Sequence, residues 1–218
     1  MDEVDTRGIC VVGNGHFTKP LGHLINMFDT VIRLSSFRIR DYESLVGTKT
    51  DIVSVGRIEN LEVEPRLVWV ANKSGMYDVP MEIILNHYKN VVFNDENTFL
   101  SAYAELGYNK AESHPTLGFQ TIFMAIKISK FMWNKPVTIC GFDFGHEGWP
   151  VHYWSQKNRF IEVEKDVHVL SNERRVVKQM IADGRVQLLN PYDMILFDDK
   201  LPPNYEKYLS LMENGERI

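Results

Sequence analysis

The sequence predicts an α/β/α sandwich with a mostly parallel sheet, in the Rossmann-like class. Short β-branched runs alternate along the chain with longer segments of helical periodicity, which is typical of this class. The first run, Ile9–Val12, stops at Gly13-Asn14-Gly15, as expected of a buried strand that feeds a tight turn. We expect a single domain over residues 1–218, a length that can bury a substantial core.

The remaining elements follow in chain order. Strands are expected at 30–34, 51–55, 66–71, 91–93, 136–140 and 186–189. Helices are expected from Thr18 or Pro20 to Phe28, and at 79–87, 96–106, 116–133 and 171–183. Asp95 and Thr116 are candidate N-caps, and Gly107 closes the helix at 96–106. In the helix at 116–133, the expected core contacts are Phe119, Ile122, Phe123, Ile126 and Phe131.

Composition narrows the possible classes of protein. Hydrophobic residues make up 44% and charged residues 24%, which is ordinary for a globular chain. The formal charge is −5 and the basic residues are scattered, so nucleic acid is not an expected partner. No apolar run reaches the ~20 residues that span a bilayer, and the N-terminus does not resemble a signal peptide. We therefore expect a cytoplasmic chain, or one whose anchor has been removed. Peripheral membrane contact through the C-terminal extension 201–218 is an alternative to its packing on the domain.

Ligands of open parallel sheets bind beyond the carboxyl ends of the strands. The turn Gly13–Gly15 and the loop that starts at Gly141 both follow predicted strands. A glycine turn between a strand and a helix can aim backbone N–H groups at a phosphate. The segment His114–Gly118 is a second loop that leads into a helix N-terminus. The long aromatic segment 145–166 has little periodicity, and we expect it to be a lid or active-site loop.

Four segments of the chain resemble, in order and spacing, the sialyl motifs of the sialyltransferases of glycosyltransferase family 29. Residues 9–51 resemble the L motif, with its Val-Gly-Asn, its Asp-x-Val-Ile-Arg and its Val-Gly-x-Lys-Thr. The stretch from His114 to Phe142 is similar to the S motif. His152-Tyr153-Trp154 resembles motif III, and His168 with Glu173 fits the very short motif, His-x4-Glu.

The resemblance implies a variant GT-A-type glycosyltransferase fold and an inverting enzyme. Such an enzyme moves sialic acid from CMP-sialic acid to a hydroxyl of a glycan acceptor, without a metal ion or other cofactor. His168 takes the position of the general base, a role that suits the pKa of histidine. His152 takes the role of stabilising the phosphate of the departing CMP. Glu173 lies in a first helical turn, where we expect it to be positional.

The other candidate site residues fall into two groups. The expected donor nucleotide-binding residues are Gly13, Asn14, Gly15, Ser35, Thr116, Leu117, Gly118, Gly141, Phe142, Tyr153 and Trp154. The expected acceptor-side residues are His16, His146 and Trp149.

The chain also departs from the family pattern. Ser35 stands where the L motif usually has a second asparagine that contacts the nucleotide, which puts that contact in doubt. Thr116-Leu117 replaces the Ser-(Ser/Thr) pair of the S motif. The family's disulfide between these two motifs has no clear equivalent, because Ile9 occupies the place of its first cysteine. This fits a reduced, bacterial-type enzyme, with Cys10 and Cys140 as buried free thiols.

Three other functions remain open at the level of sequence. One is the transfer of 3-deoxy-manno-octulosonic acid (Kdo) from its CMP-linked form. A second is a nucleotide-binding dehydrogenase, although the third glycine of that fingerprint is missing. A third is a non-catalytic CMP-binding relative, suggested by Ser35. The acceptor, the linkage, the oligomeric state and the roles of His114 and Asp143 stay undetermined.

Overall fold

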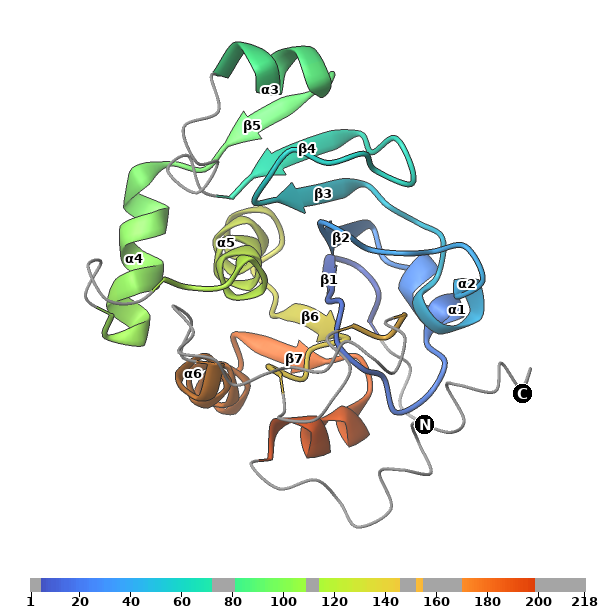
Figure 1. Ribbon diagram of the computed structural model, residues 1–218. Coiled ribbons are helices and arrows are strands. Elements are labelled where there is room, and N and C mark those ends of the chain that lie inside the picture. The colour runs from blue at the N-terminus through green and yellow to red at the C-terminus, as the bar shows by residue number, and fades with distance from the viewer. Residues whose placement is uncertain (1–4, 72–80, 109–113, 146–151, 155–169, 199–218) are drawn as a thin grey trace.

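The computed structural model describes residues 5–71, 81–108, 114–145, 152–154 and 170–198. Within these residues, seven strands form one sheet in the order β5-β4-β3-β2-β1-β6-β7, and every neighbouring pair is parallel (Figure 1). The strands are β1 (Ile9–Val12), β2 (Thr30–Leu34), β3 (Ile52–Val55), β4 (Leu67–Val70), β5 (Val91–Phe93), β6 (Val137–Cys140) and β7 (Val186–Leu188). All six strands expected after the first are confirmed.

Helices cover both faces of the sheet, which confirms the expected sandwich (Figure 1). The helices are α1 (Gly22–Asn26), α2 (Glu43–Val46), α3 (Met81–His87), α4 (Glu96–Leu106), α5 (Leu117–Met132), α6 (Leu170–Ala182) and the 3-10 helix η1 (Pro191–Phe197). One face packs against α4, α5 and α6, and the other face packs against α1 and α2. None of the described helices is long and apolar enough to cross a membrane.

Local sequence signals set both ends of α4 and the start of α5. Asp95 caps α4 by accepting a hydrogen bond from the N–H of Thr98 at 2.8 Å, and Gly107 ends the helix at φ +69°. Thr116 caps α5 by accepting a hydrogen bond from the N–H of Phe119 at 3.1 Å. Both expected caps are therefore confirmed.

Several expected features are corrected by the structure. Helix α1 begins at Gly22, because the hydroxyl of Thr18 donates a hydrogen bond to Asp193 instead of capping a helix. Phe131 lies on the solvent side of α5 and is 88% exposed, so it is not a core residue. Helices α2 and η1 were not expected from the sequence.

Cys10 and Cys140 are both buried and free, as expected. Their Sγ atoms are 4.0 Å apart on neighbouring strands. The register pairs Cys10 with Thr138 and Cys140 with Val12, so the two cysteines are offset by two residues. A disulfide requires about 2.05 Å between its sulfurs. Burial also raises the pKa of the Cys140 thiol, which disfavours the reactive thiolate.

Candidate active site

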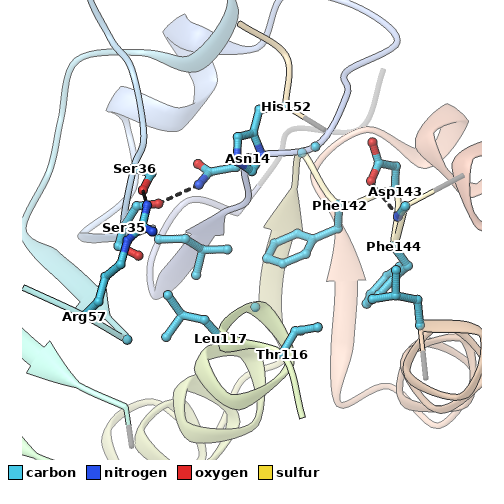
Figure 2. Close-up of a pocket in the computed structure, with 17 residues that line it drawn as sticks. Asn14, Ser35, Ser36, Arg57, Thr116, Leu117, Phe142, Asp143, Phe144 and His152 are labelled. Carbon is cyan, nitrogen blue, oxygen red and sulfur yellow. Dashed lines mark hydrogen bonds between the residues drawn. The ribbon is translucent and has the colours of Figure 1, made fainter. Parts of the chain in front are cut away.

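A cavity of about 520 Å³ opens beyond the carboxyl ends of β1, β2, β3 and β6 (Figure 2). It lies where the strand order reverses. Strands β2 to β5 follow one another on one side of β1, and β6 and β7 lie on its other side. Open parallel sheets place their ligand sites at this switch point. The expected site residues that line the cavity are Asn14, Gly15, Ser35, Thr116, Leu117, Gly118, Gly141, Phe142 and His152.

The glycines after β1 are required by the close approach of the loop after β6. A Cβ atom on Gly13 would lie 2.1 Å from the carbonyl oxygen of Gly141. A Cβ atom on Gly15 would lie 2.8 Å from the carboxyl carbon of Asp143. The N–H of Gly13 donates to the carbonyl of Cys140, and the N–H of Gly15 donates to the carbonyl of Gly141, each at 2.8 Å.

These hydrogen bonds correct one expectation. The N–H groups of Gly13 and Gly15 are used within the protein, and the N–H of His16 donates to Asp143 at 3.0 Å. The turn therefore does not present these three N–H groups to a phosphate. Its backbone instead joins β1 to β6, and Gly13 itself is not part of the cavity wall.

His16 and Asp143 form a buried pair beneath the cavity. Nδ1 of His16 lies 2.6 Å from Oδ2 of Asp143, and the N–H of Gly145 donates to Oδ1 at 3.0 Å. Burial alone would raise the pKa of Asp143, but the hydrogen bonds from His16 and Gly145 outweigh it and leave the pKa below its ordinary value. His16 is 1% exposed and does not line the cavity, so the structure gives no support to its expected acceptor-side position.

Asn14 connects the turn after β1 to the end of β2. Its Nδ2 donates to the backbone carbonyl of Ser35 at 2.7 Å. Its Oδ1 is buried and has no hydrogen-bond donor among the described residues. An unsatisfied buried acceptor is costly, so a ligand or water that donates to this oxygen would be stabilised.

The start of α5 forms the wall opposite Asn14 (Figure 2). Glu173, from the first turn of α6, holds this wall in place. Its Oε1 accepts from the N–H of Thr116 and its Oε2 accepts from the hydroxyl of Thr116, both at 2.6 Å. Glu173 is 0% exposed, and burial raises the pKa of its carboxyl to about 7 against the opposing effect of the Thr116 hydrogen bonds. Its position supports the expected positional role and ties the very short motif-like segment to the S motif-like segment.

The three residues of the segment resembling motif III have different surroundings. His152 lines the cavity, and its ring stacks on Trp154 with centroids 4.5 Å apart. Tyr153 is buried, and its hydroxyl donates to the backbone carbonyl of Arg38. Neither Tyr153 nor Trp154 lines the cavity, because both rings pack in or against the core around β1 and β2. This packing gives no support to the expectation that these two rings close over the nucleotide.

Three expected residues, His168, His146 and Trp149, lie outside the described residues, as does most of the expected lid at 145–166. The C-terminal extension 201–218 lies outside them too. His114 is described, and its Nδ1 is hydrogen-bonded with the hydroxyl of Tyr103, away from the cavity wall. Within the described ranges, no three His, Cys, Asp or Glu side chains are grouped as a metal site would need.

Several cavity residues were missed at the level of sequence. They are Leu34, Ser36, Gly56, Arg57, Phe144, Gly145 and Leu170, while Asp143, whose role the sequence left open, also lines the cavity. Most of them directly follow a strand, so a rule that takes the first residues after each parallel strand would have found them. Arg57 differs from the rest because it brings a permanent positive charge to the cavity.

Comparison with known proteins finds similarity to sialyltransferases. Residues 3–57 match glycosyltransferase family 29 (sialyltransferase). The type 2 lactosamine alpha-2,3-sialyltransferase of Mus musculus is 24% identical in an alignment 220 positions long, which covers 85% of this chain and 65% of that protein. The chain thus spans somewhat less than two thirds of the length of this relative.

Two solved structures have a similar fold. A mammalian sialyltransferase aligns with a TM-score of 0.59 and 17% identity, over 84% of this chain and 68% of its own. The monofunctional alpha-2,3-sialyltransferase Cst-I of Campylobacter jejuni aligns with a TM-score of 0.55 and 14% identity, over 98% of both chains. At these identities the likeness shows the fold, which is the expected variant of the GT-A type. The sequence matches and the fold together make this chain similar to the sialyltransferases of glycosyltransferase family 29.

Proposed function

We propose that this protein transfers sialic acid from CMP-sialic acid to a hydroxyl group of a glycan. The observation that carries the proposal is the cavity at the switch point of the sheet. Three segments far apart in sequence line it: the turn at Asn14, the start of α5 at Thr116–Gly118, and His152. These are the segments that resemble the L motif, the S motif and motif III.

The cavity has a size and a lining that suit a nucleotide-sugar. A volume of about 520 Å³ lies within the range of small-molecule sites, ~300–1,000 Å³. Its walls combine apolar side chains such as Leu117 and Phe142 with polar groups from Asn14 and Ser36. The apolar surface suits the face of a cytosine ring, and the polar groups suit ribose hydroxyls.

The proposed reaction is a single displacement with inversion. The acceptor oxygen attacks the anomeric carbon of the sugar while the bond to the CMP phosphate breaks on the opposite face. His168, as general base, takes the proton of the acceptor hydroxyl. His152, at the cavity wall, stabilises the charge that develops on the departing phosphate.

We further propose that the reaction needs no metal ion. CMP leaves with a single phosphate, whose charge cationic and hydrogen-bonding side chains can stabilise without a divalent ion. For the acceptor, we propose a lactosamine-type glycan joined by an α-2,3 linkage. This choice rests on the relatives, whose names specify lactosamine and the α-2,3 linkage.

A parallel assay of two donors tests the proposal. The protein is incubated with a lactosamine acceptor and either CMP-sialic acid or CMP-Kdo, and CMP release and product mass are measured. We expect acceptor-dependent CMP release and a sialylated product only with CMP-sialic acid. Product from CMP-Kdo alone would assign the other sugar, and tight CMP binding without any turnover would indicate a non-catalytic relative.

A further inference from the structure

The cavity contains one permanently positive side chain among the described residues that line it. This side chain is Arg57, which follows β3 and Gly56. The other ionisable lining groups are His152 and Asp143, and Asp143 is tied to His16 and Gly145. A CMP-linked sialic acid brings two negative charges, one on its phosphodiester and one on the carboxylate of its sugar. Arg57 is therefore the natural counter-charge in this part of the chain.

Neighbouring residues hold Arg57 against the end of β2 (Figure 2). The carboxylate of Glu59 accepts from the N–H of Ser36 at 2.6 Å and from its hydroxyl at 2.8 Å. Ser36 has a left-handed backbone with φ 62°, so this double contact fixes an uncommon turn. Arg57 Nη2 then donates to the hydroxyl of Ser36 at 3.2 Å.

The guanidinium still has donors to offer a ligand. The Nε of Arg57 lies 3.8 Å from a carboxylate oxygen of Glu59, which is a long ion pair. The side chain of Arg57 is 71% exposed. Exposed pairs of this kind are weak, and both oxygens of Glu59 are already bonded to Ser36. An arginine carries five N–H donors in a planar fork that matches phosphate and carboxylate oxygens.

The sequence offers an independent reason for an added cation here. Ser35, beside Ser36, occupies the position where the L motif usually has an asparagine that contacts the nucleotide. The serine side chain keeps a hydroxyl but has no amide group. The N–H groups of Gly13, Gly15 and His16 are also engaged within the protein. An anion in the cavity therefore cannot use these three N–H groups, and side-chain donors at the wall become more important.

We propose that Arg57 binds an anionic group of the CMP-sugar donor, with Glu59 and Ser36 positioning its guanidinium. The inference rests on the proposed function, because the anion belongs to the CMP-sugar donor. The phosphate of CMP and the carboxylate of the sugar present the same chemistry to a guanidinium, and the choice of ligands below separates them.

Calorimetry with three ligands tests this role. Cytidine has no anionic group, CMP has a phosphate, and the inert donor CMP-3-fluoro-sialic acid has a phosphodiester and a carboxylate. For Arg57→Gln we expect unchanged affinity for cytidine and an affinity for the fluorinated donor about tenfold weaker. An equal loss for CMP assigns the contact to the phosphate, and a loss for the donor alone assigns it to the carboxylate. Affinity of the wild type should also fall more steeply with added salt than that of Arg57→Gln.

Arg66→Gln is the matched control. Arg66 is 85% exposed and lies 3.7 Å from the carboxylate of Asp51, but it precedes β4, at the sheet edge opposite the cavity. We expect its three affinities to equal those of the wild type. Wild-type affinity of Arg57→Gln for both CMP and the donor would overturn the inference, and so would an equal loss for cytidine. A wild-type protein that binds neither CMP nor the donor would overturn the proposed function together with this inference.

Discussion

Replacement of Glu173 by glutamine tests whether a buried carboxyl under the cavity is held largely as a neutral acid. Glu173 is 0% exposed, and its only described acceptor contacts are the two hydrogen bonds from Thr116. Burial raises its pKa from 4.5 to about 7. Since the folded protein holds this proton more tightly than the unfolded chain, stability from this group is complete below pH 4.5 and is lost as the pH rises through 7.

The magnitude follows from the size of the shift. The pKa moves from 4.5 to about 7, a difference of about 2.5 units, and each unit corresponds to about 1.4 kcal/mol. The full effect on the free energy of unfolding is therefore about 3 kcal/mol, and most of it falls between pH 5 and pH 8. Glutamine keeps the shape of the side chain and its carbonyl acceptor but does not titrate.

The assay is urea unfolding of both proteins at pH 5 and pH 8. All other titrating groups are shared, so they cancel in the difference between Glu173→Gln and the wild type. We expect this difference to shift in favour of the variant by about 2–3 kcal/mol from pH 5 to pH 8. Glu96→Gln, which removes an exposed carboxylate from the first turn of α4, controls for the loss of a helix-terminal charge. A difference that stays constant, or that shifts in favour of the wild type, would refute the reasoning.

Three further predictions concern the proposed reaction. His168→Ala should lower turnover by roughly 10²–10⁴ at saturating substrates and leave CMP affinity nearly intact, because the base acts on the acceptor proton; a fully active variant would exclude this base. Asn14→Ala should weaken CMP binding in calorimetry, since it removes both the contact with Ser35 and the buried acceptor; unchanged affinity would remove Asn14 from the site. Activity should persist in EDTA, and loss with recovery on adding Mg²⁺ or Mn²⁺ would contradict the metal-free proposal.

The features that the sequence predicted well are those encoded locally. β1 and β6 are buried at every position, so their apolar runs are continuous and easily recognised. The caps of α4 and α5 depend on residues three positions apart. Because the ends of parallel strands meet at one edge, the cavity at Asn14 and Gly141 also followed from the order of the elements.

The features that the sequence did not predict depend on partners distant in the chain. Thr18 has the local context of a helix start, but its partner Asp193 lies 175 positions later. Tyr153 follows a cavity histidine, yet its hydroxyl is bonded to the backbone of Arg38, 115 positions earlier. Arg57 reaches the cavity only because β3 pairs with β2, and that strand order cannot be obtained from periodicity.

The hydrogen bonds between the turn Gly13–Gly15 and the loop that starts at Gly141 limit how an anion can be bound in this cavity. The N–H groups of Gly13 and Gly15 are bonded to the end of β6 and are therefore not available to a ligand. The N–H of Thr116 is likewise bonded to Glu173. A strand-turn-helix pattern suggests an anion site made of backbone N–H groups. Here the N–H groups of the turn after β1 are bonded within the protein instead, because this turn packs closely against the loop after β6. Among the described side chains at the wall, those of Asn14, Ser35, His152 and Arg57 can donate to an anion, beside the backbone at the start of α5. If the cavity binds the proposed donor, the charge of Arg57 compensates for the side-chain amide that Ser35 lacks.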